Sequence, residues 1–348
     1  MSTAMEGGGR YNANASAQAA SSVFGLDLLR EAAAAAPLGP AGVVTVVDYG
    51  SSEGRNSLAP MSAAVETVRR VRGEHQPVWV CHTDLPGNDF GSLFHTVADD
   101  PDTYRRPGVY TAAVGRSFYE QLLPEGWVGV GWSSIAVHWL SAVPGRLDGF
   151  WFSSASAEQY TAWARAGAAD WSAFLAARAA EMLPGARLVI VVGAAHGEGP
   201  TRRSGAERAM DEVARGLQEL VGRGVLGEEE RDAMTIPAWY RTAAEWRAPF
   251  DDGGDLVLEQ LEFVDIGDPL WRQTGESRGE QPSTYPATVA AALRVSFGPS
   301  LLQELDPDRR ATVATELFDR HLAGAIATER PEPWFDWRLA VMVVAKRG

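Results

Sequence analysis

Apolar runs and helical spacings alternate along the first 195 residues of the chain. Residues 43–47 form a β-branched run that ends at Asp48, a pattern typical of a buried parallel strand. Residues 57–72 then place apolar side chains at three- and four-residue spacings, which predicts a helix. This alternation indicates a parallel sheet covered by helices on both faces. The same patterns predict further strands over 77–81, 127–132, 186–192, 255–266 and 337–344, and further helices over 154–183 and 203–220.

The second half of the chain is rich in helical spacings, and only two predicted strands return there. A chain of 348 residues fits two domains, or one domain that carries an insertion. We therefore expect a core sheet interrupted by a helical cap. The expected parts are a core with an N-terminal arm over 1–198, a first cap segment over 199–254, a core strand over 255–277, a second cap segment over 278–332 and a final core strand over 333–348. The first twenty residues are small and polar, and we expect a mobile arm.

Composition narrows the classes of function and the compartment. The formal net charge is −14, which argues against binding to nucleic-acid phosphates or to anionic lipid surfaces. The single cysteine, Cys81, excludes an internal disulfide and a cysteine-based zinc or iron–sulfur site. The six histidines show no metal-binding spacing, so we expect no metal. The sequence shows no signal peptide and no run of about 18 apolar residues, so we expect a cytoplasmic protein without a membrane span.

The loop after the first predicted strand carries the first chemical signal. It begins at Asp48 and contains Gly50 and Gly54 before Asn56. Ligands of doubly wound sheets bind beyond the carboxyl ends of the strands, where glycines let the backbone approach a cofactor. The dinucleotide fingerprint G-x-G-x-x-G is absent, which disfavours NAD and FAD. An acidic strand end and a short glycine loop fit a nucleoside with a cationic tail, such as S-adenosylmethionine. A plain strand–helix turn explains the pattern equally well.

The same loop also matches the nucleophile elbow of serine hydrolases. Residues 50–54 satisfy G-x-S-x-G, follow a predicted strand and precede a predicted helix, which would make Ser52 the nucleophile. The elbow would lie on the first strand, however, whereas a hydrolase needs an oxyanion loop upstream of it. The downstream histidines His138, His196 and His321 stand in no recognisable setting. A serine hydrolase is therefore a distant alternative.

Polar side chains also follow two later strands. Asp84 is expected at a strand end, where a carboxylate accepts hydrogen bonds from ribose hydroxyls. His138 and Trp139 lie just beyond another strand, and an indole N–H binds an oxyanion without competing for a proton. The simpler interpretations are a helix cap and turn at Asp84, and core packing of His138 and Trp139.

Taken in chain order, several segments resemble one known family. They are Tyr11…Asn14…Gln18, the loop 48–56, the run D-L-P-G-N-D-F over 84–90, Ser117-Phe118-Tyr119, Ser133-Ser134 and His138-Trp139-Leu140-Ser141. They resemble the SABATH family of S-adenosylmethionine-dependent methyltransferases, which methylate small acids such as salicylate, benzoate, jasmonate and indole acetate, and in one branch xanthine nitrogens. The chain departs from the family pattern at Ser51, which replaces a cysteine, and at Ile135, which replaces a tyrosine of the substrate pocket. Residues 199–331 match only loosely.

The resemblance implies an α/β fold, with a Rossmann-like class I methyltransferase sheet and an α-helical cap. It implies S-adenosylmethionine as the cofactor and formation of the methyl ester of a small, aromatic or heteroaromatic carboxylic acid. Gln18 and Trp139 would donate hydrogen bonds to the substrate carboxylate, and His138 would tune the pocket or act as a base. The residues implied to hold the cofactor are Tyr11, Asp48, Gly50, Asn56, Asp84, Leu85, Ser117, Phe118 and Ser133. The residues implied to line the substrate pocket are Gln18, Ile135, His138 and Trp139. Composition adds Trp239, because the chain has twelve tryptophans and this one falls in the cap half, where an aromatic pocket would need it.

Two further functions stay open at the level of sequence. An N-methyltransferase acting on a heteroaromatic ring nitrogen would use the same cofactor site, and its product would resist mild base. A non-catalytic binding protein would keep the cofactor fold without turnover. Because family members often form homodimers, we also expect a homodimer.

Overall fold

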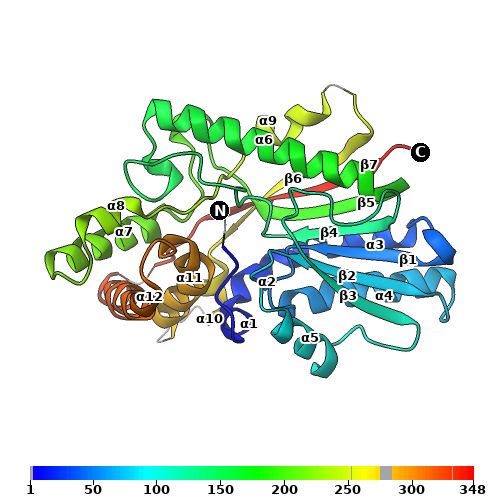
Figure 1. The fold of residues 1–348 in the computed structure, drawn as a ribbon, viewed down its shortest axis with the longest axis horizontal. Helices are drawn as coiled ribbons and strands as arrows, with labels where there is room; N and C mark the ends of the chain where they lie inside the picture. The colour runs from blue at the N-terminus through cyan, green and yellow to red at the C-terminus, as the bar shows by residue number, and fades with distance from the viewer. Residues whose placement is uncertain (1–2, 252, 275–283, 331) are drawn as a thin grey trace.

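The computed structural model describes residues 3–251, 253–274, 284–330 and 332–348. Its centre is a seven-stranded sheet with the order β3-β2-β1-β4-β5-β7-β6. The strands are β1 (Val44–Tyr49), β2 (Val78–Asp84), β3 (Val109–Gly115), β4 (Val128–Ser134), β5 (Met182–Gly193), β6 (Leu256–Gly267) and β7 (Trp337–Lys346). The first five run parallel, and β7 lies antiparallel between β5 and β6. The predicted parallel α/β sheet is therefore confirmed (Figure 1).

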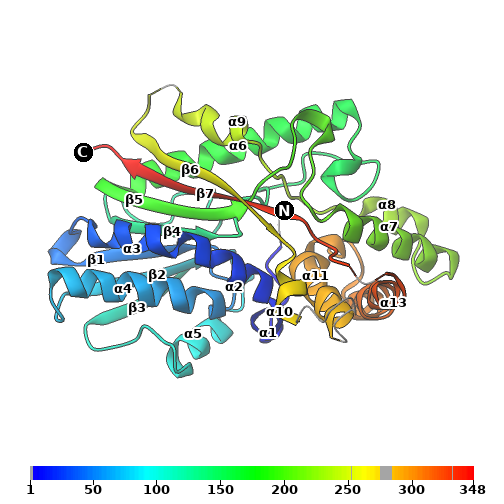
Figure 2. The same cartoon turned by 180° about the vertical axis from the view of Figure 1, so that it is seen from behind.

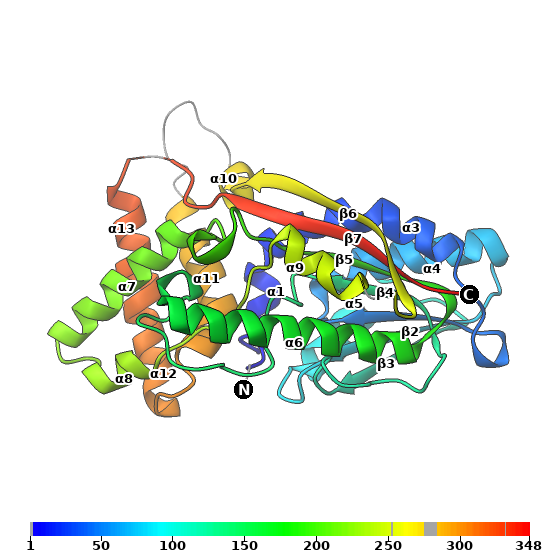
Figure 3. The same cartoon turned by 90° about the horizontal axis from the view of Figure 1, so that it is seen from above.

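Helices cover both faces of the sheet. Figures 2 and 3 place α3 (Leu26–Ala34) and α4 (Leu58–Arg72) on one face, and α6 (Ala157–Glu181) with α9 (Ala243–Arg247) on the other. Because side chains alternate along a strand, Val46 of β1 packs in the cluster under α3 and α4, whereas its neighbour Val47 packs in the cluster under α6. This alternation explains why β1 and β5 read as continuous apolar runs in the sequence.

The cap consists of helices gathered beyond the carboxyl ends of the parallel strands (Figures 1 and 3). They are α7 (Glu207–Gly222), α8 (Glu228–Ala233), α10 (Pro269–Thr274), α11 (Tyr285–Leu301), α12 (Pro307–Ala314), the π-helix η7 (Thr315–Leu322) and α13 (Ala323–Thr328). Apolar faces of α7, α11 and η7 share one buried cluster with Trp139 and Phe335. The cap thus forms a second hydrophobic core that reaches the end of the sheet. The expected border at residues 277 and 278 lies outside the described residues.

The N-terminal arm is ordered by hydrogen bonds, so the expectation of a mobile arm is wrong from residue 3 onward. It forms α1 (Arg10–Asn14) and α2 (Ser16–Ser22). The Glu53 carboxylate accepts from the backbone N–H groups of Gly9 and Asn12, at 2.7 and 2.9 Å. On its other side the arm contacts α11, where the Glu6 N–H donates to the Val295 carbonyl at 3.4 Å. The arm therefore joins the loop after β1 to the cap.

Several elements differ from the prediction. Helix α6 ends at Glu181, and β5 begins at Met182, so Pro184-Gly185 lies inside a strand. The left-handed backbone of Gly185, with φ of 81°, accompanies a register shift between β4 and β5. Helix α7 begins at Glu207 because the Glu207 carboxylate accepts from the N–H groups of Ser204 and Gly205, ahead of the helix. Strand β3, which was not predicted, is a half-exposed edge strand.

In the part of the chain that the structure describes, the helices are too short or too polar to cross a bilayer.

Candidate active site

Four of the predicted cofactor residues, Asp48, Gly50, Asp84 and Leu85, lie at the carboxyl ends of β1 and β2. The strand order reverses between β1 and β4, and doubly wound sheets bind ligands at such a point. Asp48 in β1 is buried, and its Oδ2 accepts a hydrogen bond from Ser57 Oγ. His82 Nδ1 lies 3.4 Å from the same oxygen. Asp48 Oδ1 accepts no hydrogen bond from the described residues and stays available to a ligand.

Asp84, the last residue of β2, is held by backbone donors only. Its carboxylate accepts from the N–H groups of Ser52 at 2.7 Å and Leu85 at 2.8 Å. Burial raises the pKa of Asp84 to about 6, the two backbone hydrogen bonds oppose that shift, and the nearby Asp48 carboxylate adds to it. No cationic side chain pairs with it among the described residues. A desolvated carboxylate with free lone pairs fits the ribose hydroxyls of a nucleoside cofactor.

The turn between β1 and η3 (Arg55–Ser57) explains the glycine at position 50. Gly50 has φ of 95°, and a Cβ there would lie 2.5 Å from the Ala136 Cβ, so any side chain would clash. Ser52, the residue singled out as a nucleophile, also adopts a left-handed backbone, with φ of 48°. Its Oγ is buried and has no hydrogen-bond partner in the described chain. The base that a serine hydrolase needs is therefore missing beside Ser52.

The loop after β3 carries Ser117 and Phe118, and a buried ion pair holds it from behind. Arg178 donates to the Phe118 carbonyl at 2.8 Å and to the Glu120 carbonyl at 2.9 Å. Arg178 also pairs with Glu181 at 2.8 Å, and neither side chain is exposed. The Phe118 ring contacts Phe174 edge-on, with ring centroids 5.7 Å apart. It also comes within 3.8 Å of the position of a Cβ at Gly50, so the glycine turn and this loop enclose one space.

Three of the predicted cofactor residues belong to the arm, hold it in place or bond to the sheet backbone. The Asn56 amide donates to the Ala15 carbonyl at 3.2 Å and so holds the arm in place. Tyr11 lies in the arm itself, and burial, followed by the carboxylates of Asp84 and Glu53, raises the pKa of its hydroxyl. Ser133 is fully buried, and its hydroxyl donates to the Tyr49 carbonyl at 2.8 Å, so its side chain serves the sheet.

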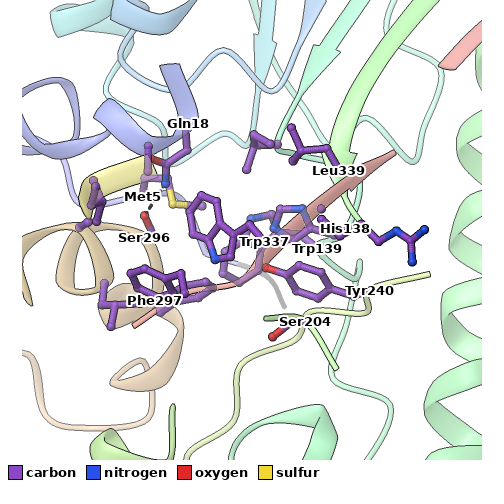
Figure 4. Close-up of a pocket in the computed structure, with 18 of the residues that line it drawn as sticks. Met5, Gln18, His138, Trp139, Ser204, Tyr240, Ser296, Phe297, Trp337 and Leu339 are labelled. Atoms are coloured by element: carbon purple, nitrogen blue, oxygen red, sulfur yellow. Dashed lines mark hydrogen bonds between the residues drawn. The ribbon is translucent and has the colours of Figure 1, made fainter. Parts of the chain in front are cut away.

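A pocket opens between the sheet, the arm and the cap (Figure 4). Predicted residues that line it are Tyr11, Gln18, Ile135, His138 and Trp139. The other lining residues include Met5, Leu270, Leu293, Phe297, Phe335, Trp337 and Leu339. Arg338 is the one charged residue among the described lining residues, and it lies 3.4 Å from Asp265. The pocket is therefore apolar, and its polar groups are almost all neutral.

Gln18 and Trp139, the two predicted donors, both face this pocket. Gln18 lies in α2, and its Nε2 donates to Ser296 Oγ of α11 at 2.9 Å. The Trp139 ring packs against Phe297 with centroids 5.6 Å apart. Its indole N–H has no acceptor among the described residues. The pocket thus brings together two neutral donor groups that lie far apart in the sequence.

His138 is kept neutral by its surroundings. Its ring is buried and stacks on Tyr240 with centroids 5.0 Å apart. Burial lowers the pKa of His138 to about 3, and the Arg241 guanidinium contributes to the shift. A histidine with that pKa is a weak base near pH 7, which disfavours the suggested role in proton transfer.

Ile135 occupies a strained backbone position beside the pocket. Its φ is 52°, which is rare for a β-branched residue, and its N–H donates to the Val191 carbonyl at 2.7 Å. Strain of this kind gathers at functional sites, where the surrounding structure holds it.

Trp239 lies outside the pocket, contrary to the sequence-based expectation. It is fully buried against Gly167 of α6, and its indole donates to Glu245 at 3.3 Å. The next residue, Tyr240, lines the pocket instead. In extended chain a shift by one residue moves a side chain to the opposite face, so composition identified the right segment and the wrong side chain.

The wall contributed by α11 was also missed. Leu293, Ser296 and Phe297 share one face of this helix and line the pocket. Their three- and four-residue spacing was a usable signal for a helix face. Nothing in that spacing indicated that the face meets Gln18, nearly 280 residues earlier.

Comparisons with known proteins agree with this geometry. A family model described as SAM dependent carboxyl methyltransferase matches residues 2–332. Gibberellic acid methyltransferase 2 of Arabidopsis thaliana is 26% identical over 300 residues, which cover 80% of this chain and 76% of that protein. Salicylate carboxymethyltransferase of Clarkia breweri is 27% identical over 278 residues, 74% of each chain.

A solved structure supports the fold. Loganic acid methyltransferase with SAH matches with a TM-score of 0.79 and 19% identity, and the match covers 99% of both chains. The class I methyltransferase fold with a helical cap is therefore confirmed. The family match also overturns the serine-hydrolase alternative, since the chain is a methyltransferase that uses S-adenosylmethionine. Since the family model spans nearly the whole chain, this protein belongs to the SAM dependent carboxyl methyltransferase family.

Proposed function

We propose that this enzyme forms the methyl ester of a small acid with one carboxylate and an aromatic or heteroaromatic body. One observation carries the proposal: the pocket is mostly apolar, and its described lining residues include two neutral N–H donors, the amide of Gln18 and the indole of Trp139. The relatives named for salicylate and gibberellic acid support a carboxylate as the acceptor. Aromatic side chains such as Phe297 and Trp337 suit a flat ring.

The reaction asks little proton chemistry of the protein. A carboxylic acid with a pKa near ~4.3 is ionised at neutral pH, so its oxygen attacks without a general base. Bound S-adenosylmethionine supplies the methyl group; the new C–O bond forms as the S–C bond breaks, and no proton moves. The neutral state of His138 agrees with this, because a base with a pKa of about 3 has no task here.

Gln18 and Trp139 orient the anion and leave most of its charge in place. Neutral N–H donors fix one carboxylate oxygen without the full charge compensation of a guanidinium. The apolar walls exclude water, which keeps that oxygen poorly solvated and reactive. Asp48, Asp84, Phe118 and the turn at Gly50 would hold the cofactor at the adjoining strand ends, so that the pocket side of the bound cofactor meets the acid.

The proposal is tested with labelled S-adenosylmethionine and a panel of small aromatic acids. We expect label in a product heavier by one methyl group, and loss of that label after mild base, because esters hydrolyse. A product that resists base would indicate methylation of a ring nitrogen. Cofactor binding by calorimetry without turnover on any acid would favour a binding protein.

We also infer a homodimer that works in the cytoplasm. The family resemblance supports the first inference, and the single buried cysteine, Cys81, agrees with a reducing compartment. Light scattering at several concentrations tests the oligomeric state; a monomer at every concentration would contradict it.

A further inference from the structure

We propose that Ser296 is a positioning residue that turns the Gln18 amide so that its NH2 group faces the substrate carboxylate. This inference rests on the proposed function, because it assigns the role of one more residue in binding the acid. It concerns the point where the arm meets the cap, and Figure 4 shows the contact as a dashed line between the two side chains.

The contact between these residues is buried and links distant elements. Ser296 lies in α11, is 6% exposed and lines the pocket. Its Oγ lies 2.9 Å from Gln18 Nε2. The neighbouring pocket residues on the same helix face, Leu293 and Phe297, are apolar. Ser296 is therefore the polar group of α11 that meets the Gln18 amide.

The amide orientation leaves polar atoms without partners. Gln18 Oε1 is buried and accepts no hydrogen bond. The hydroxyl proton of Ser296 likewise finds no acceptor in the described chain. Buried polar groups without partners cost free energy, and such pairs are uncommon in folded proteins.

A half-turn of the amide pairs the oxygen and the hydroxyl with each other, and it leaves the buried NH2 group in need of an acceptor. Amide oxygen and nitrogen have nearly the same shape, so the turn needs no other movement. The Ser296 hydroxyl then donates to Gln18 Oε1, and the NH2 group takes the place of the oxygen. Both N–H bonds become free for a ligand, and the carboxylate of the substrate supplies the acceptor oxygens.

Serine at this position therefore selects between two orientations of one side chain. Without its hydroxyl, the amide carbonyl is free to point at the anion and repel it. A hydroxyl suits this task because it donates a hydrogen bond to the Gln18 amide oxygen. That bond keeps the amide oxygen away from the substrate carboxylate. Ser296 acts through Gln18, and the reacting oxygen itself is contacted by Gln18 and Trp139.

Ser300 provides a matched control on the same helix. It lies four residues after Ser296, is 2% exposed, and its Oγ is 2.9 Å from Thr3 Oγ1 of the arm. It therefore joins α11 to the arm as Ser296 does, but it does not line the pocket. Ser300→Ala removes a hydroxyl of the same kind without touching Gln18.

The test measures kcat/KM for an acid that the wild-type enzyme methylates, with the cofactor Kd and the midpoint of thermal unfolding as folding checks. Ser296→Ala should lower kcat/KM about tenfold, mainly by raising KM. Ser300→Ala should leave kcat/KM within about twofold of wild type. In a Gln18→Ala background, Ser296→Ala should have no further effect, because the residue it positions is gone.

A second pair of variants covers the case in which Ser296→Ala does not fold. Ser296→Thr keeps the hydroxyl, and Ser296→Val has nearly the shape of threonine but lacks the hydroxyl. We expect Thr to retain kcat/KM and Val to lose it, at equal cofactor affinity.

Two results would overturn the inference while the proposed function stands. They are unchanged kcat/KM in Ser296→Ala, and an equal loss in the presence and in the absence of Gln18. A wild-type enzyme that methylates no acid in the panel would instead overturn the proposed function, and this inference with it.

Discussion

At the scale of single residues, the proposed site uses one carboxylate and one indole whose surroundings differ. Asp84 is partly buried and receives two backbone hydrogen bonds, and burial raises the pKa of its carboxyl group. Trp139 keeps a free N–H in an apolar wall. Each of these leads to a measurement on a separate half of the reaction, cofactor binding or acid turnover.

Cofactor binding should weaken in acid because of Asp84. Its raised pKa of about 6 means that the carboxylate is half protonated near pH 6 and mostly protonated a unit below that value. Only the ionised form accepts two ribose hydroxyl bonds, so the Kd for S-adenosylmethionine should rise about tenfold per pH unit below pH 6. Calorimetry between pH 5 and pH 8 tests this expectation.

Asp84→Asn is the control for that titration. It should raise Kd by about 100-fold at pH 7.5, through loss of two charge-assisted hydrogen bonds, and make Kd nearly independent of pH. If the variant binds as wild type does, Asp84 does not contact the cofactor.

Acid turnover should depend on the Trp139 indole. Trp139→Phe removes one N–H and keeps an aromatic ring, so kcat/KM for the acid should fall by about 10- to 100-fold while cofactor Kd stays unchanged. Trp151→Phe is the matched control, since Trp151 packs against the same Phe297 ring and its buried N–H already lacks a partner. Equal losses in the two variants would point to packing and would remove the donor role.

At the scale of elements, the pair Arg178–Glu181 of α6 supports the loop that carries Ser117 and Phe118, which we propose to contact the cofactor. Arg178→Met would leave Glu181 buried without a cation and release the loop that carries Ser117 and Phe118. We expect a loss of about 3–5 kcal/mol in the free energy of unfolding, and weaker cofactor binding. Thermal denaturation and calorimetry measure the two effects.

Arg165→Met gives the comparison on the same helix. Arg165 is exposed, so its loss should change neither stability nor cofactor affinity. An Arg178→Met variant as stable as wild type would mean that the loop is held by other contacts.

The sequence indicated most strands and the motif residues, but it did not indicate how elements meet. Buried strands such as β1 and β5 can be predicted from the sequence because their side chains are apolar on both faces of the sheet. Strand β3 was missed because its half-exposed residues carry no period. The sequence did not predict that the arm is structured, because its partners Glu53 and Val295 lie far away in the chain. The sequence also indicated Trp239 where Tyr240 lines the pocket, because tertiary packing decides which face of that segment meets the pocket.

At the scale of the whole molecule, a net charge of −14 opposes the approach of an anionic acid. Capture must then come from the pocket itself. Added salt screens the repulsion, so kcat/KM for the acid should rise by less than about tenfold between low and physiological ionic strength. Steady-state kinetics at constant pH test this, with cofactor saturating. A fall in kcat/KM with salt would reveal a local positive field at the entrance.

The place of β7 in the sheet has a consequence for synthesis on the ribosome. This strand, the last of the seven along the chain, lies between β5 and β6 and pairs with both. Until residues 337–346 have emerged, β5 has one unpaired edge, β6 has no partner strand, and the pocket lacks Trp337 and Leu339. A nascent chain of this enzyme therefore needs protection from aggregation until the last strand arrives, and neither the sheet nor the pocket is complete before that moment.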